Sequence, residues 1–304
     1  MNQDLQGRSV IETLADTYRQ LFLAPGEDGQ QKYPDIVQKG EDPDSRDLSH
    51  FITSEDDSLT WEETPAGTVP VVTLAERADF VTFLRIMGNR CAMTEIPGTQ
   101  GASILDGVIN WRKIDRHKEE FFRNAMEQGD VSPDWKTEFL NFTKDRQNFK
   151  DALIVLSKGP YSAVPASRLD LSEEEWISLS GTIRRAHECT HFICRRLYPE
   201  KKHAVWDELV ADAVGIYAAF GRFDEKMEKL FLGITDGHYT GGRLANYVKA
   251  DTEEKKSRML EELSVRISAV LRAFSVILSA HPGITPYEYA ILLEENMEIP
   301  VIGS

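Results

Sequence analysis

The sequence predicts an α+β protein that is predominantly helical, with a small sheet in its N-terminal half. Apolar residues recur at helical spacing through most of the second half, whereas short runs rich in β-branched residues fall in the first half or just after it. The 304 residues are 41% hydrophobic and 28% charged, which is ordinary for a soluble globular protein with a sizeable core. We expect two regions: 1–150 with helices, strands and an acidic loop, and 151–304 with the helices that carry the candidate functional residues.

The N-terminal region is predicted to mix helices and strands. Ser9 can cap an amphipathic helix over 9–24, which Pro25 ends. Residues 26–65 hold twelve acidic and three basic residues and read as a solvated loop. Thr73 and Glu76 resemble a capping box for a helix that reaches Met87. The other predicted elements are a hairpin of 59–64 with 68–72, a strand over 102–112, helices over 115–128 and 133–147, and a strand over 152–157.

The C-terminal region is predicted to be a set of helices. Ser172 opens the sequence "SEEE", a capping box for a helix that runs to about Leu197 and ends before Pro199. A second helix covers about 204–220, and Thr285 begins a last helix that ends near Met297. The apolar stretch 263–280 is interrupted by two arginines, so it predicts a buried core helix and not a membrane span.

The composition makes several partners and compartments poor expectations. The net charge of -15 repels phosphate backbones and anionic lipids, so we expect no nucleic-acid partner and no membrane partner. Three cysteines do not form a disulfide framework, and the N-terminal residues lack the basic start and apolar run of a signal peptide. These features favour the cytoplasm. The sequence leaves the oligomeric state open.

The predicted helix from Ser172 carries the sequence His187-Glu188-Cys189-Thr190-His191. Residues four apart on a helix lie about 40° apart around its axis and one turn along it, so both imidazoles can reach one metal ion. The usual zinc–nitrogen distance is about 2.0–2.1 Å. Glu188 is badly placed to be a third ligand from this turn, but it is well placed to take a proton from a water molecule beside the metal.

A catalytic zinc site needs a third protein ligand, and the next predicted helix offers Glu208. Two antiparallel helices joined by a short loop bring such positions face to face. Asp212, one turn after Glu208, could accept the outer N–H of a ligating histidine and fix its tautomer. His203 in the turn and Asp207, which points about 100° away from Glu208, remain alternative ligands.

These residues resemble the gluzincins, the thermolysin-like zinc metallopeptidases. That family has His-Glu-x-x-His on one helix and Glu-x-x-x-Asp on a following helix, which here are His187, Glu188 and His191, then Glu208 and Asp212 in "ELVAD". The resemblance spans about 26 residues. It implies a zincin-like fold, a Zn²⁺ cofactor, two histidine ligands and a glutamate ligand, Glu188 as the general base, and Asp212 as the acid that orients a ligand.

The family pattern implies two further parts. One is an edge strand before the active-site helix, to which an extended peptide adds, and "YSAVPA" at 161–166 is in the right place. The other is a residue that stabilises the oxyanion, for which the glycine-rich segment 235–243 offers His238, Tyr239 and Arg243. Of these candidates, His238 and Tyr239 are the predicted catalytic residues.

The sequence thus predicts a zinc-dependent hydrolase, most simply a metallopeptidase acting on a peptide or protein substrate. The alternative is a non-enzymatic metal-binding or regulatory protein built on a zincin-like scaffold. In a third interpretation, a plain helical interaction protein, the histidines would be incidental.

Overall fold

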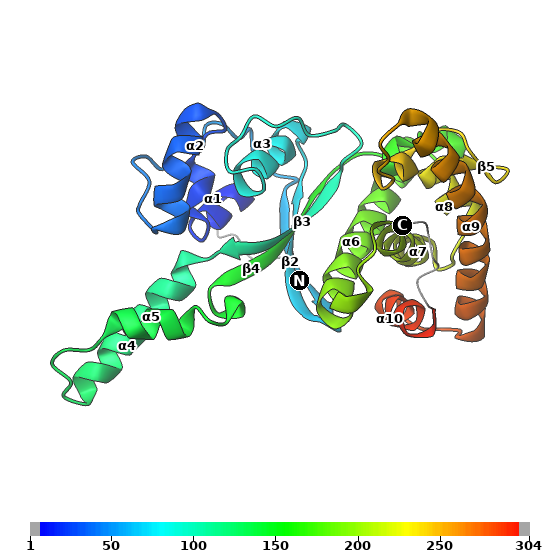
Figure 1. Ribbon diagram of the computed structural model, residues 1–304. Helices are drawn as coiled ribbons and strands as arrows, with labels where there is room; N and C mark the ends of the chain where they lie inside the picture. Colours follow the sequence, from blue (N-terminus) through cyan, green and yellow to red (C-terminus); the bar gives the residue numbers. More distant parts are fainter. Residues whose placement is uncertain (1–6, 298–304) are drawn as a thin grey trace. The chain divides into compact units, whose positions relative to one another are not determined.

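The structure is a computed structural model that describes residues 7–297 (Figure 1). The described chain is mainly helical with a small mixed sheet, which confirms the predicted α+β class. It divides into two units. Unit 1 contains the residues up to Trp61 together with Pro70–Ile96 and Ile104–Ser157, and unit 2 contains Glu62–Val69, Pro97–Ser103 and the residues from Lys158 onward. The second unit therefore takes two short segments from the first half of the sequence.

The sheet has four strands in the order β1-β2-β4-β3. They are β1 (Ser58–Thr64), β2 (Gly67–Leu74), β3 (Ala102–Ile109) and β4 (Lys150–Ser157). The neighbouring strands β1 and β2 confirm the predicted hairpin, while β2 and β4 run parallel and pair Thr73 with Leu156. This pairing holds Thr73 inside a strand, so the predicted capping box is wrong. The helix α3 (Arg77–Met87) instead has Glu76 at its N-cap, without a side-chain hydrogen bond.

Helices of unit 1 surround a core formed with β2 and β4. Ser9 and Glu12 form a capping box at α1 (Val10–Ala15). The helix ends earlier than predicted, because the chain turns to a 3-10 helix at Arg19–Phe22 and the Tyr18 hydroxyl donates to Asp151 on β4 at 2.7 Å. The core includes Leu21, Val72, Leu74, Phe80, Phe83, Leu153 and Val155.

Two segments of unit 1 differ from their predictions in extent. The predicted acidic loop 26–65 contains α2 (Glu27–Tyr33), a π-helical turn at Pro34–Gln38 and all of β1. The predicted helices over 115–128 and 133–147 are observed as α4 (Trp111–Glu127) and α5 (Trp135–Phe142), which pack against each other (Figure 1).

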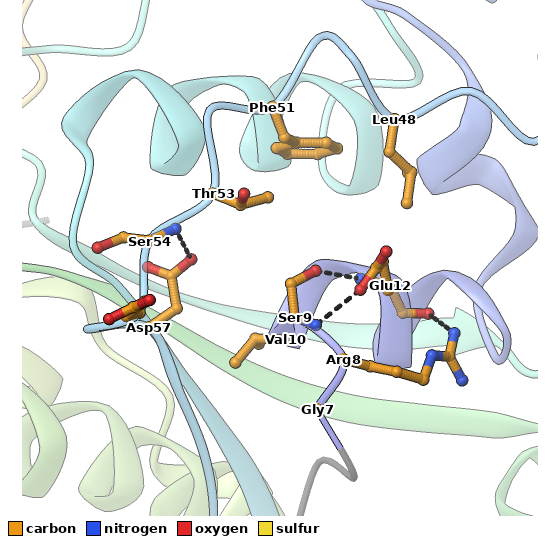
Figure 2. A pocket seen from close by; sticks show the side chains of 11 residues that line it. Gly7, Arg8, Ser9, Val10, Glu12, Leu48, Phe51, Thr53, Ser54 and Asp57 are labelled. Atoms are coloured by element: carbon orange, nitrogen blue, oxygen red, sulfur yellow. Dashed lines mark hydrogen bonds between the residues drawn. The ribbon is translucent and has the colours of Figure 1, made fainter.

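Unit 1 also has a hollow of about 570 Å³ beside α1 (Figure 2). Two pairs of its polar groups are bonded to each other: the Ser9 and Glu12 side chains close the capping box, and the Ser54 backbone N–H donates to Asp57 at 3.1 Å. Phe51 and Leu48 line the opposite wall. These residues therefore have local structural roles in capping α1 and in packing beside it.

Unit 2 is a group of helices around α7 (Ala204–Phe220), which packs against α6 (Glu173–Leu197), α8 (Glu225–Leu232) and α10 (Pro286–Asn296) (Figure 1). The capping boxes at Ser172 and Thr285 confirm the predicted starts of α6 and α10. Short elements complete the unit: 3-10 turns at Tyr161–Ala163, Ala166–Arg168, Pro199–Lys201 and Arg243–Asn246, and a two-residue hairpin of β5 (Ile234–Thr235) with β6 (His238–Tyr239). The core contains Trp206, Leu209, Val214, Ile267, Phe274 and Tyr289.

The expected edge strand at 161–166 is wrong. Residues Tyr161–Ala163 form a 3-10 turn, with Ser162 and Ala163 at positive φ. The Tyr161 backbone N–H donates to the Ser180 hydroxyl on α6 at 2.9 Å, and the Tyr161 ring is buried. The chain is thus folded onto α6 here, and this turn offers no extended edge to a peptide.

The helix α9 (Glu253–Ala280) contains the apolar stretch that the sequence singles out. Its length and composition alone would let it cross a membrane. However, Ile267, Leu271 and Phe274 are fully buried in the core of unit 2, while Arg266 and Arg272 are exposed. The helix thus contributes one apolar face to the core of unit 2.

Candidate metal centre

The helices α6 and α7 lie against each other and bring the predicted ligands together. The residues between them, Tyr198–His203, include a 3-10 turn at Pro199–Lys201 that reverses the chain. The two helices lie in close contact at Gly215, where an added Cβ would lie 2.9 Å from the Ile183 carbonyl oxygen. This close packing turns one face of α7, which carries Glu208, toward the face of α6 that carries His187 and His191.

His187, His191 and Glu208 offer ligand atoms that all lie within 4.8 Å of one another. The two Nε2 atoms are 3.0 Å apart. The Glu208 carboxylate lies 3.5 Å from Nε2 of His187 through Oε2, and 3.4 Å from Nε2 of His191 through Oε1. Both histidines are buried, with 5% and 6% of their surface exposed.

These separations fit a tetrahedral zinc ion. Ligand atoms at about 2.0–2.1 Å from one ion in tetrahedral geometry are about 3.3 Å from each other. The two Nε2 atoms are 3.0 Å apart, and each lies 3.4–3.5 Å from a different oxygen of the Glu208 carboxylate, so the spacing of the three side chains is close to this value. Two imidazoles and one carboxylate are also a donor set that zinc uses in catalytic sites, where a fourth position stays open.

Asp212 orients His187 through Nδ1, the ring nitrogen that is not directed at the other two ligands. Nδ1 of His187 lies 2.9 Å from Oδ1 of Asp212, a carboxylate with no exposed surface. Because an ionised carboxylate only accepts hydrogen bonds, Nδ1 carries the proton and Nε2 presents its lone pair to the other ligands. A carboxylate that fixes the tautomer of a ligating histidine in this way is the usual outer partner of a zinc site.

Asp212 is itself held by two side chains that the sequence does not point to clearly. The Tyr161 hydroxyl donates to Oδ1 of Asp212 at 2.6 Å, and Arg243 forms an ion pair with Oδ2. Arg243 also donates to the Tyr161 hydroxyl at 2.9 Å. The buried negative charge of Asp212 is thus matched by a buried guanidinium.

Glu208 has an outer partner of its own. The Tyr247 hydroxyl donates to Oε2 of Glu208 at 2.9 Å. Tyr247 and Arg243 come from one short segment, so a single stretch of chain contacts both acids of α7. Arg243 stands in the glycine-rich segment noted from sequence, but Tyr161 and Tyr247 lie far from the histidine motif and carry no motif of their own.

Electrostatics in the cluster follow from burial and opposite charge. Burial alone would lower the pKa of His187, but its hydrogen bond to Asp212 and the nearby charges raise it above the usual value. Burial alone would raise the pKa of Glu208, yet the neighbouring histidines hold it well below its usual range. The pKa of Asp212 is likewise lowered, against its burial, by Arg243 and His187.

Other predicted residues occupy separate positions. Glu188 follows His187 on α6 and is buried, with 8% of its surface exposed. The alternative ligands cap α7: Nδ1 of His203 accepts from the Trp206 N–H, and Asp207 accepts from the His203 N–H at 3.2 Å. Both residues stand outside the group of three ligand atoms within the described residues.

His238 and Tyr239 have their observed contacts away from the cluster. Nδ1 of His238 pairs with Glu261 at 3.0 Å on the surface of the unit. The Tyr239 hydroxyl donates to the Gly242 carbonyl at 2.8 Å. Their role in stabilising an oxyanion stays a prediction, and Arg243 is the residue of this segment that the structure brings next to Asp212.

Comparison with known proteins gives the chain a family. The family of unknown function DUF7005 matches residues 2–292. The chain belongs to this family. No curated protein and no solved structure matches the chain. The match to DUF7005 includes every residue of the cluster, from Tyr161 to Tyr247, so the cluster lies inside the family's own domain.

Proposed function

We propose that this DUF7005 protein is a zinc-dependent hydrolase, and specifically a metallopeptidase of zincin-like fold that acts on a peptide or protein substrate. The observation that supports the proposal is the group of three ligand atoms that lie within 4.8 Å of one another, with Asp212 on the outer nitrogen of His187. Two imidazoles and one carboxylate are also the number and kind of protein ligands that a catalytic zinc takes.

His187, His191 and Glu208 would hold the ion. When bound, zinc would supply Lewis acidity and lower the pKa of a water molecule to about 7. Glu188 would accept the proton of that water as its oxygen forms a bond to the carbonyl carbon. The same carboxylic acid would then give the proton to the amide nitrogen as the C–N bond breaks, which leaves Glu188 ionised again.

The proposal extends to partners and compartment. A net charge of -15 supports neither a nucleic-acid nor a membrane partner. Three free, buried cysteines fit a reducing compartment such as the cytoplasm.

The test compares the wild-type protein with its Glu188→Gln variant. Gln keeps the size and hydrogen bonding of the side chain but removes the base. We expect about one zinc per chain in both proteins, while cleavage of a mixed peptide pool falls by about 10²–10⁴-fold in the variant. Undiminished cleavage by Glu188→Gln would rule out the general-base role.

Metal analysis tests the ligands independently of activity. His187→Ala, His191→Ala and Glu208→Ala should each lose tight zinc binding, while His203→Ala and Asp207→Ala should keep it. Full zinc occupancy in the double histidine variant would disprove the site. Zinc binding without any hydrolysis would favour the alternative, a metal-binding or regulatory protein on the same scaffold, for which the buried and internally paired cluster is also suited.

A further inference from the structure

The segment from Gly233 to Tyr247 makes a tight crossing beside the proposed metal site. Gly233 ends α8 in the left-handed conformation, at φ 81°. Eight residues later the chain returns: an added Cβ on Gly233 would lie 2.3 Å from the Gly241 carbonyl oxygen, and one on Gly242 would lie 2.6 Å from the Gly233 Cα. Two backbones can approach this closely only where neither has a side chain.

The crossing determines where the next residues point. Arg243 begins a 3-10 turn immediately after Gly242, and Leu244 is fully buried in the core of the unit. With the backbone held at Gly242 and the side chain held at Leu244, the segment has little freedom. Arg243 then reaches Tyr161 and Asp212, and Tyr247 reaches Glu208 at 2.9 Å.

We propose that Arg243 and Tyr247 are positioning residues. Together they hold the metal ligands in their binding arrangement before the ion binds. This inference rests on the proposed zinc site. Arg243 pairs with Oδ2 of Asp212 and so holds the Asp212 carboxylate against Nδ1 of His187. Tyr247 holds Oε2 of Glu208, which leaves Oε1, the oxygen 3.4 Å from Nε2 of His191, as the one to ligate. Neither residue is assigned a contact with substrate.

The chemistry of each side chain suits this role. The guanidinium donates to Tyr161 and pairs with Asp212 at the same time, which a lysine ammonium on a flexible stem does poorly. The phenol gives one directional hydrogen bond to a carboxylate whose second oxygen stays available. Partners of this kind outside the ligand shell typically change metal affinity by about 10–100-fold.

The experiment uses zinc alone as the probe. The dissociation constant is measured for the full chain by competition with a chromophoric chelator, and Co²⁺ spectra are recorded as a second readout of ligand geometry. Tyr247→Phe removes only the hydroxyl that contacts Glu208. Its matched control is Tyr217→Phe, which removes a hydroxyl on α7 that donates to the Ile284 carbonyl at 2.7 Å.

We expect Tyr247→Phe to bind zinc about 10–100-fold more weakly and to shift the Co²⁺ absorption, while Tyr217→Phe matches the wild type in both. Arg243→Lys keeps the buried positive charge and should also weaken zinc. If Tyr247→Phe and Arg243→Lys fold and bind zinc like the wild type, the positioning role is overturned and the metal site stands. If the wild type itself binds no zinc, the metal site falls and the positioning role falls with it.

Discussion

Two buried acids, Asp212 and Glu228, have no exposed surface yet differ sharply in their surroundings. Asp212 accepts hydrogen bonds from Tyr161 and His187 and pairs with Arg243. Both carboxyl oxygens of Glu228, by contrast, have no hydrogen-bond partner within the described residues. Burying a charge without a partner is costly, so a carboxyl in this position keeps its proton. Accordingly the pKa of Asp212 is lowered, whereas burial raises the pKa of Glu228 well above its usual value.

This contrast predicts that Glu228→Gln stabilises the protein in a pH-dependent way. Because the folded-state pKa is raised, the native state binds a proton that the unfolded state releases above about pH 4.5, the ordinary pKa of a glutamate. Stability of the wild type therefore falls as pH rises from there through the folded-state pKa. Gln does not titrate, so the variant should melt higher than the wild type at pH 8, by more than at pH 5.

Thermal unfolding of both proteins across this pH range measures the effect. The control is Glu254→Gln, since Glu254 is exposed on α9 and its replacement should leave the pH profile of the wild type unchanged. A difference between Glu228→Gln and the wild type that shrinks as pH rises would contradict the prediction.

At the scale of the elements, the sequence predicts best what short-range chemistry decides. The capping box of Ser172 with Glu175 and the left-handed Gly221 after α7 mark the two site helices locally, and both were predicted at nearly the observed bounds. The spacing of His187 and His191 follows from one helix alone. Predictions failed where a distant segment decides: Thr73 pairs with Leu156 on β4 instead of capping a helix.

The same reason limits what the sequence says about the site. Tyr161, Arg243 and Tyr247 lie 51, 31 and 39 residues away in the sequence from the acids that they contact. No periodic pattern records a contact of that kind. The family pattern places Tyr161 in an edge strand, because nothing in the sequence "YSAVPA" shows that its hydroxyl is buried against Asp212.

The site also depends on how closely α6 and α7 pack, and this predicts a difference between two glycines. A Cβ on Gly215 of α7 would lie 2.9 Å from the Ile183 carbonyl oxygen, while a Cβ on Gly181 of α6 would meet no atom within 4 Å. Alanine favours helix over glycine by about 0.5–1 kcal/mol. Gly181→Ala should therefore be neutral or stabilising, whereas overpacking should make Gly215→Ala about 1–3 kcal/mol less stable than that control.

Zinc affinity gives the functional readout for these two variants. Gly215→Ala pushes α7, which carries Glu208, away from α6, which carries both histidines, so it should also weaken zinc. Gly181→Ala should not. Denaturant unfolding and chelator competition measure the two quantities, and equal values for both variants would show that the helix contact at Gly215 does not set the site.

For the whole molecule, the division into two units predicts which parts of the chain a bound metal stabilises. All three proposed ligands belong to unit 2, whose core is built from α6 to α10, while unit 1 has a separate core around β2 and β4. A ligand that binds only the native state stabilises it by about 2.7 kcal/mol at a concentration of 100 Kd. That free energy should appear in the structure that unfolds together with the site.

Native-state hydrogen exchange with and without zinc measures this distribution. We expect slower exchange for peptides from α6, α7 and the segment 243–247, and unchanged exchange for peptides from α3 and β4. The His187→Ala, His191→Ala double variant is the control and should show no zinc effect in any peptide. Slower exchange confined to unit 1, or an equal effect in the double variant, would mean that zinc acts on this protein somewhere other than the cluster on α6 and α7. Protection that rises equally in both units would instead show that they unfold as one, because a stabilisation is shared by every residue whose exchange requires the same opening.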